Sequence, residues 1–146
     1  MDLYFDHGDG VYLYTEDGTR YLDFTSGIGV TCLGHSHPAL VSALREQAGK
    51  LWHCSNLFKI KGQETVAKKI VDHSFASNVF FCNSGAEAVE AGIKAVRKYF
   101  YLNKKNKYKI ICVNNAFHGR TLGAISAAGQ DKLLEGFDPR LDGFEH

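Results

Sequence analysis

A turn of small residues follows an apolar run and opens a helical pattern, and it is the stretch of the sequence best suited to chemistry. Ser84, Gly85 and Ala86 occupy this turn. The first turn of a helix has backbone N–H groups without an internal partner, and it carries the positive end of the helix dipole. Because no bulky side chain stands in the way, an anion such as phosphate can approach these N–H groups closely. The turn therefore indicates an anion site.

A capping interaction is the alternative interpretation of the same turn. Ser84 is followed three residues later by Glu87, and this spacing is typical of a capping box, in which the two side chains satisfy the free N–H groups without a ligand. The spacing leaves both interpretations open. The turn lacks both the Walker A motif and the full GxGxxG pattern, so nucleotide binding is the weaker ligand hypothesis.

A second candidate loop, residues 114–121, follows the next apolar run and contains Phe117, His118 and Arg120. An aromatic ring can support a flat cofactor, and a guanidinium can bind a carboxylate through two hydrogen bonds. Taken singly, Phe117 is typical of a core position, and His118 and Arg120 of the surface. Ligands of open parallel sheets bind outside the carboxyl ends of the strands, so we expect both loops to lie at one edge.

The elements that must position these loops form an α/β pattern. The runs Val79–Cys82 and Ile110–Val113 are apolar throughout, and a helical pattern from Gly85 to about Leu102 lies between them. Runs of this kind are typical of strands that are buried on both faces. The sequence therefore predicts a βαβ unit with a parallel sheet.

Shorter elements precede this unit. Val11–Tyr14 and Tyr21–Phe24 flank Asp17-Gly18, which predicts a β-hairpin. A glycine-rich stretch then leads to Pro38, where helical spacing begins, and a second amphipathic helix is expected from Gly62 to His73. We therefore divide the chain into an N-terminal segment, 1–60, and a second segment, 61–146.

The composition narrows the possible partners and sites. The 146 residues include 17 Lys and Arg against 16 Asp and Glu, for a net charge of +1. This balance gives no reason to expect a nucleic acid or an anionic membrane as partner. The apolar runs are too short to span a bilayer and the first residues are acidic, so a cytoplasmic protein without membrane contact is expected.

The cysteines and two histidines have structural explanations. Cys82 and Cys112 lie in the predicted strands, where thiols pack as small apolar groups, and the four cysteines contain no CxxC pair. His35 and His37 have no third ligand type nearby and are expected to orient the turn before Pro38. No metal site is predicted.

Four motifs, in this order, resemble the N-terminal part of class III aminotransferases, and they look most like acetylornithine and ornithine aminotransferases. They are Tyr21-Leu22-Asp23-Phe24-Thr25-Ser26-Gly27-Ile28-Gly29-Val30, Leu33-Gly34-His35-Ser36-His37-Pro38, Asn83-Ser84-Gly85-Ala86-Glu87-Ala88 and Phe117-His118-Gly119-Arg120-Thr121. The resemblance covers essentially the whole chain. One small departure is Val89, where the acetylornithine enzymes often have Asn.

The resemblance implies a fold-type-I enzyme that uses pyridoxal 5′-phosphate (PLP). Such an enzyme moves an amino group from acetylornithine or a related ω-amino donor to 2-oxoglutarate, a step of arginine biosynthesis. Residues 61–146 would be the first part of the PLP-binding large domain. The resemblance also assigns roles to single residues: cofactor binding to Ser84, Gly85, Ala86, Phe117 and His118, with Phe117 stacked on the pyridine ring, and substrate binding to Arg120, Ser26 and Gly27.

Members of this family are several hundred residues long, and their Schiff-base lysine and pyridinium-binding aspartate lie downstream of the part that this chain resembles. None of the lysines present, including Lys94 and Lys132, stands in a matching context. We therefore expect no catalytic residue in this chain, and no transaminase activity from it alone.

An incomplete parallel sheet would expose an apolar edge. A homodimer, or a separate chain that supplies the C-terminal remainder, is the expected way to cover it. The alternative hypothesis is a non-catalytic binding or scaffold module that keeps the anion-binding turn and pairs with another chain.

Overall fold

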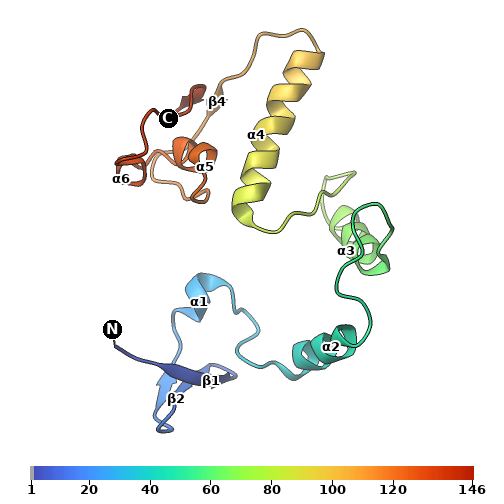
Figure 1. The fold of residues 1–146 in the computed structure, drawn as a ribbon, viewed down its shortest axis with the longest axis vertical. Helices are drawn as coiled ribbons and strands as arrows, with labels where there is room; N and C mark the ends of the chain where they lie inside the picture. The colour runs from blue at the N-terminus through green and yellow to red at the C-terminus, as the bar shows by residue number, and fades with distance from the viewer. Residues whose placement is uncertain (1) are drawn as a thin grey trace. The chain divides into compact units, whose positions relative to one another are not determined.

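The computed structural model describes residues 2–146 and divides them into two compact units, one that ends at Lys61 and one from Gly62 to His146. Figure 1 shows the helices and strands of each unit in the colour order of the chain. Both units contain strands and helices, so the expected mixed α/β class is confirmed. The assignment of 1–60 and 61–146 to family domains stays a prediction. No helix within residues 2–146 is long and apolar enough to cross a membrane.

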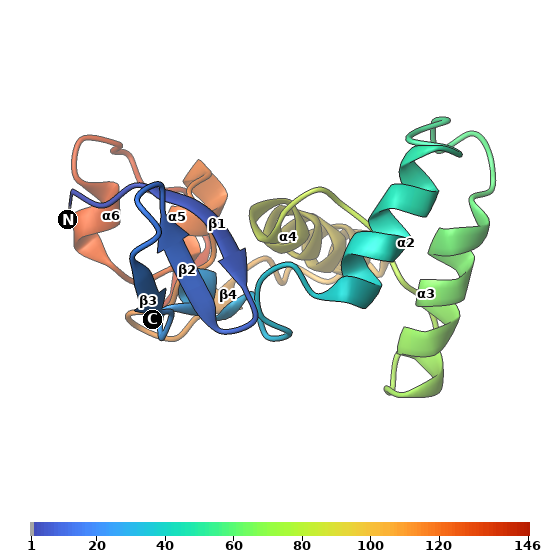
Figure 2. The same cartoon turned by 90° about the horizontal axis from the view of Figure 1, so that it is seen from below.

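The N-terminal unit begins with an antiparallel sheet whose strands lie side by side in the order β1-β2-β3 (Figure 2). The strands are β1 (Phe5–Asp9), β2 (Tyr12–Thr15) and β3 (Arg20–Leu22). The predicted hairpin is therefore confirmed, with bounds shifted by one or two residues. Strand β1 was not predicted because its sequence, FDHGD, is polar and contains a glycine.

A left-handed turn follows the sheet and carries two of the predicted substrate residues. The short element α1 (Ser26–Gly29) has positive φ at all four residues: 49° at Ser26, 61° at Gly27, 65° at Ile28 and 76° at Gly29. Glycine adopts this conformation freely, whereas each other L-residue loses roughly 1–2 kcal/mol in it. Neighbouring contacts must therefore stabilise this turn.

Helix α2 (Pro38–Ala48) starts where the proline predicts it, and His37 caps it. The His37 side chain accepts a hydrogen bond from the Ala39 N–H over 3.3 Å. The His35 ring instead contacts Asp23, with 2.8 Å between Nε2 and Oδ2. Both histidines thus act in the turn before Pro38, as expected. Across residues 2–146, no cluster of His, Cys, Asp and Glu side chains is arranged to hold a metal ion.

The second unit is organised around the long helix that the sequence predicts. Helices α3 (Lys61–Asp72) and α4 (Gly85–Leu102) match the predicted ranges closely. Short elements follow, namely β4 (Ile110–Ile111), α5 (Leu122–Ala127), α6 (Asp131–Leu134) and β5 (Phe144–Glu145). The small core forms where α5 packs between α4 and α6; its buried apolar residues are Ile93, Ala124, Ile125, Ala127, Ala128 and Leu134.

The predicted strand Val79–Cys82 is wrong, and with it the βαβ unit that joins it to residues 110–113. A strand needs a neighbour for its backbone hydrogen bonds, and residues 79–82 pair with no strand of the described chain. Parallel pairing does occur, but it joins β4 to β5, with Ile110 opposite Phe144. Cys82 is consequently exposed, which corrects its predicted packing role, while Cys112 is half-buried.

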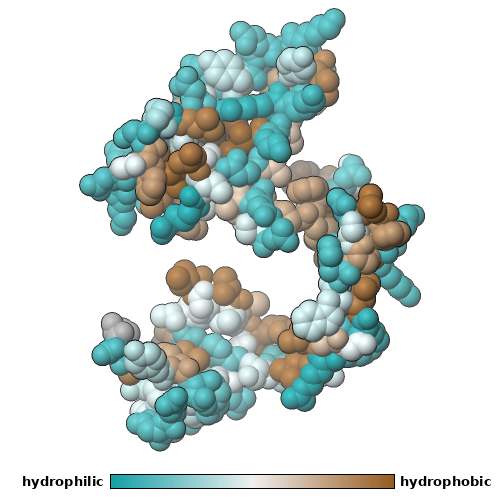
Figure 3. Space-filling model, in the orientation of Figure 1, coloured by the Kyte–Doolittle hydropathy of each residue, from teal (hydrophilic) through white to brown (hydrophobic). Residues whose placement is uncertain are grey.

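Large apolar side chains remain at the surface of both units, as the brown areas of Figure 3 show. Phe80 is 76% exposed and Val113 is 76% exposed, although both lie in runs that the sequence marks as buried. Apolar residues of such runs normally pack against neighbouring elements. These surfaces are therefore suited to contacts beyond the described residues.

The carboxylate of Asp23 makes the stability of the N-terminal unit depend on pH in the acid range. Hydrogen bonds from the Thr25 hydroxyl first, and then from His35 and the Ser26 N–H, lower the pKa of Asp23 from 3.8 to about 2. Because the folded pKa lies below the unfolded one, this stabilisation is complete above pH 3.8 and is lost as the pH falls to about 2. We expect Thr25→Val to raise the pKa of Asp23 toward 3.8, as measured by an NMR pH titration.

Thr15→Val is the matched control, since the Thr15 hydroxyl makes the corresponding contact with Asp17 in the hairpin turn. It should leave the titration of Asp23 unchanged. An Asp23 carboxyl that titrates near 3.8 in the unsubstituted protein would contradict the described network.

Candidate functional site

The start of α4 combines a side-chain cap with an exposed backbone. Ser84 is extended, with φ −153° and ψ 163°, and its Oγ accepts a hydrogen bond from the Glu87 N–H over 3.2 Å. Glu87 reaches back in turn, and its Oε2 accepts from the Asn83 N–H over 2.6 Å. The capping contact between Ser84 and Glu87 is therefore confirmed. It satisfies the N–H groups of Asn83 and Glu87 only.

Two N–H groups of this turn stay available. Within the described chain, neither the Gly85 N–H nor the Ala86 N–H has a hydrogen-bond partner. Ser84 and Gly85 are exposed, and a Cβ placed on Gly85 would meet no atom within 4 Å. The Ser84 hydroxyl uses a lone pair for the cap and keeps its proton to donate. The capping and anion-binding interpretations are thus compatible, because they use different groups.

The second candidate loop packs directly against this turn. Gly119 has φ +118°, and a Cβ on it would lie 2.6 Å from the Ala86 Cβ. Beside it, the Thr121 hydroxyl donates to Glu90 Oε1, and Gly123 lies close to the same carboxylate. The expectation that the two loops lie together is confirmed. The contact is made by α4 and α5 rather than by the predicted sheet edge.

Residues 128–130 fix the loop of residues 114–121, although no sequence motif indicates them. The Asn115 N–H donates to the Gly129 carbonyl over 3.2 Å, and the Ala116 N–H donates to the Ala128 carbonyl over 2.9 Å. The Gln130 side chain returns a hydrogen bond to the Ala116 carbonyl over 2.7 Å. Each contact joins residues 12 to 14 positions apart, so no local sequence pattern indicates it.

The predicted ligand side chains project from this anchored loop. Phe117 is 67% exposed, which corrects the view that it is typical of a core position. The Arg120 guanidinium carbon lies 5.7 Å from the centroid of the Phe117 ring, within the range of a cation–π contact. His118 is half-buried. Phe117 and Arg120 thus belong to the loop whose Gly119 contacts Ala86 at the start of α4.

Arg120 also lines a cavity of about 280 Å³ between α5 and α6. A second cation, Lys132, contributes to the same wall, and the remaining lining is apolar: Leu122, Ile125, Leu133 and Phe137. Two cations without an acidic residue among the lining favour an anionic ligand. No sequence motif indicates this position for Lys132, whose sequence context only excludes it as the catalytic lysine.

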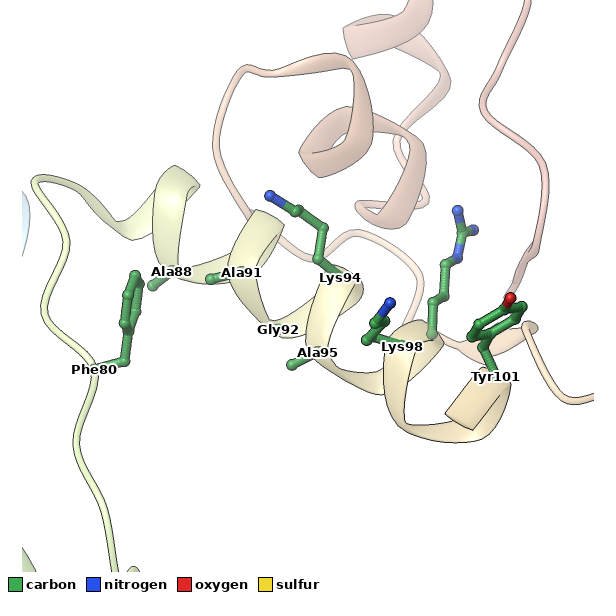
Figure 4. A pocket seen from close by; sticks show the side chains of 9 residues that line it. Phe80, Ala88, Ala91, Gly92, Lys94, Ala95, Lys98 and Tyr101 are labelled. Atoms are coloured by element: carbon green, nitrogen blue, oxygen red, sulfur yellow. The ribbon is translucent and has the colours of Figure 1, made fainter. Parts of the chain in front are cut away.

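A larger groove of about 1140 Å³ runs along α4 and contains none of the predicted ligand residues. Figure 4 shows Phe80 beside Ala88 at its start and Tyr101 at its far end. Lys94 is also among the residues that line this groove. The groove is therefore distinct from the cavity that Arg120 and Lys132 line.

Ser26 and Gly27 belong to the N-terminal unit, so their geometry is described within that unit alone. The Ser26 Oγ lies 2.9 Å from the Thr31 Oγ1, and Gly27 takes part in the left-handed turn. Their predicted role toward a substrate stays a prediction.

Comparisons with known proteins agree with the resemblance. The family model described as aminotransferase class-III matches residues 1–146. The acetylornithine aminotransferase of Mesorhizobium japonicum is 54% identical over 144 residues, which are 98% of this chain and 36% of that protein. The enzyme of the same name from Aquifex aeolicus is 53% identical over 147 residues, which cover 100% of this chain and 39% of that protein. The chain thus spans little more than a third of the length of these relatives.

Solved structures of aminotransferases also match nearly the whole chain. The adenosylmethionine-8-amino-7-oxononanoate aminotransferase of Methanocaldococcus jannaschii is 35% identical with a TM-score of 0.93, and the match covers 100% of this chain and 34% of that one. The ornithine aminotransferase of Toxoplasma gondii is 29% identical with a TM-score of 0.92, covering 99% and 35%.

The contact between the two loops can be tested with Gly119→Ala. The added methyl group would overlap Ala86, and the residue would keep a left-handed φ of +118°. We expect a loss of about 1–3 kcal/mol in the free energy of unfolding, measured by urea denaturation. Gly62→Ala is the control, since a Cβ there meets nothing within 4 Å and its φ is not left-handed. Equal stability of the two variants would contradict the close approach.

Proposed function

Because the chain belongs to the class-III aminotransferases, we propose that it is the N-terminal portion of an enzyme that transfers an amino group from acetylornithine, or a related ω-amino donor, to 2-oxoglutarate. The curated relatives named acetylornithine aminotransferase support this donor. The activity belongs to a protein of the relatives' length, of which this chain covers 36% in the first of them. The observation that carries the proposal is the pair of free N–H groups at the start of α4, beside the loop of Phe117 and Arg120.

Class III aminotransferases use PLP, and the turn at Ser84 fits its phosphate ester. The N–H groups of Gly85 and Ala86 lack protein partners among the described residues, and the space around Gly85 is open. A phosphate bound there would accept hydrogen bonds from both N–H groups and from the Ser84 hydroxyl, and it would gain from the dipole of α4. No side chain has to move out of this space.

The loop behind the turn would hold the ring of the cofactor. Phe117 offers a largely exposed aromatic face, which is suited to stacking on a pyridine ring. His118 is half-buried next to it and would complete the same wall. The backbone contacts of Asn115 and Ala116 fix the loop, so the ring position is set before a ligand binds.

Arg120 would bind a carboxylate of the substrate. Its guanidinium has two parallel N–H donors for such a group, and it reaches the cavity that Lys132 also lines. Ser26 and Gly27 would line the substrate entrance, as the resemblance implies. These residues bind and orient the reactants.

PLP, when bound, supplies the electron sink that makes removal of the amino group possible. The residues of this chain contribute placement: they hold the phosphate, support the ring and orient the substrate carboxylate. We assign no proton transfer or covalent step to them. The chain by itself is therefore inactive in this proposal, since the family's reactive lysine has no counterpart here.

The exposed apolar side chains support assembly with further protein. Phe80 and Val113 together would bring a large apolar area out of water if covered. A homodimer, or the C-terminal remainder of the enzyme, is the proposed partner. Neither a nucleic acid nor a membrane is part of the proposal.

The role of the turn can be tested with Gly85→Pro and Gly85→Ala in the full-length holoenzyme. Proline removes the Gly85 N–H but suits the first helical position after the extended Ser84. Equilibrium dialysis should show a loss of PLP affinity of about tenfold or more for proline, and little change for alanine, which keeps the N–H. Equal affinity of both variants would contradict the phosphate role, and preferential binding of NAD or ATP would contradict the proposed function.

The role of Arg120 can be tested with Arg120→Ala in the same enzyme. Loss of the charge-assisted hydrogen bonds should raise KM for the carboxylate substrate by about tenfold to a hundredfold. The PLP content, measured by absorbance, should stay near that of the unsubstituted enzyme. Lys98→Ala, on the exposed surface of α4, serves as a control for removal of a positive charge. An unchanged KM for Arg120→Ala would remove the carboxylate role.

A further inference from the structure

We propose that Asp23 and His35 are positioning residues that hold Ser26 and Gly27 in the conformation required for substrate binding. The inference rests on the proposed function and deepens it, because it names the groups that shape the substrate entrance. Neither side chain contacts substrate or cofactor in this proposal. Both act through the left-handed turn α1.

The turn is costly for two of its residues and therefore needs support. Ile28 is β-branched, has a φ of 65° and is 94% exposed, so its own side chain contributes almost no packing. Ser26 also has a positive φ. Backbone conformations of this kind persist when surrounding contacts determine them, and they concentrate at functional sites.

Asp23 supplies these contacts from one carboxylate. Its Oδ1 accepts from the Thr25 N–H at 3.0 Å, the Thr25 hydroxyl at 2.6 Å and the Ser26 N–H at 2.9 Å. The side chain is only 5% exposed, and hydrogen bonds to an ionised group in such a place are stronger than neutral ones. Two consecutive N–H groups at the entry to α1 are thereby fixed.

His35 fixes the carboxylate from the other side. Its Nε2 lies 2.8 Å from Asp23 Oδ2, and its side chain is 21% exposed. The ring packs on Gly8, where an added Cβ would lie 2.5 Å from His35 Cγ. The backbone of His35 also exchanges two hydrogen bonds with Gly10, of 2.7 and 3.1 Å. The rigid sheet thus orients His35, His35 orients Asp23, and Asp23 orients Ser26.

Val30 and Thr31 fix Ser26 from the far side of the turn. Its Oγ lies 2.9 Å from the Thr31 Oγ1, and the Val30 and Thr31 N–H groups both donate to the Ser26 carbonyl. Ser26 is thus held on both sides, by Asp23 before the turn and by Thr31 after it. A change at Asp23 therefore moves Ser26 and Gly27 without altering either residue.

The test compares Asp23→Asn with Asp17→Asn in the full-length holoenzyme. Asp17 is a matched control because its Oδ1 also accepts from a threonine hydroxyl and from a backbone N–H, those of Thr15 and Thr19, in the hairpin turn. We expect Asp23→Asn to raise KM for the amino donor by about tenfold, with kcat changed by less than about threefold and PLP absorbance unchanged. Asp17→Asn should leave all three values unchanged.

Hydrogen exchange gives a readout that does not depend on activity. In Asp23→Asn the Thr25 and Ser26 N–H groups should exchange about tenfold faster or more, while those of β2 keep their rates. His35→Gln, which keeps a donor near Nε2, should retain most of the unsubstituted KM, whereas His35→Ala should match Asp23→Asn. A KM that is retained in His35→Gln but not in His35→Ala would show that His35 acts through its hydrogen bond to Asp23 rather than through the packing of its ring.

The outcomes distinguish this inference from the proposed function. An active unsubstituted enzyme with unchanged KM in Asp23→Asn overturns the inference alone. Parallel losses of PLP content, kcat and melting temperature in Asp23→Asn show a merely structural role and also overturn it. An unsubstituted full-length protein that binds PLP but transfers no amino group overturns the proposed function and this inference together.

Discussion

The contact between Gly119 and Ala86 is the constraint on which the candidate site depends. A glycine is needed there, because any side chain would overlap the first turn of α4 at 2.6 Å. Through this contact the loop that carries Phe117 and Arg120 meets the helix end that offers free N–H groups. Even one further methyl group at residue 119 would push the loop of Phe117 and Arg120 away from the turn at Ser84.

In both units, hydrogen bonds from side chains to backbone groups fix the shape of a loop or turn. Gln130 holds the carbonyl of Ala116, and Asp23 holds the N–H groups of Thr25 and Ser26. Gln130 fixes the backbone of a distant segment and Asp23 that of its own segment, and in each case the fixed backbone lies next to residues proposed to bind ligand. Loops satisfy few of their own backbone groups, so side chains of this kind give them a defined shape. The proposed ligand residues are therefore placed before binding, which lowers the entropy lost on association.

Local sequence patterns predict the elements that depend on nearby residues. They do not predict the elements that depend on contacts with distant residues. The helices α2 and α4 follow from Pro38, from the small residues after Ser84 and from apolar residues at helical spacing. Val79–Cys82 has an equally clear strand pattern, but a strand exists only with a partner, and none pairs with it in the described residues. The candidate site shows the same division. The residues Ser84 to Ala86 were identified from their own neighbourhood, whereas the roles of Gln130 and Asp23 depend on contacts across a dozen or more positions.

The hydrogen bond from Gln130 to Ala116 also determines where the chain can change length. It closes a segment whose ends are fourteen residues apart and whose interior includes all of α5. An insertion or deletion inside that segment would shift Gln130 out of reach, and with it the register of the loop. The lysine-rich connection at residues 103–108 is exposed throughout, and its hydrogen bonds within the described chain reach no further than five positions. Homologous proteins should thus differ in length at that connection and keep the spacing from Ala116 to Gln130 constant.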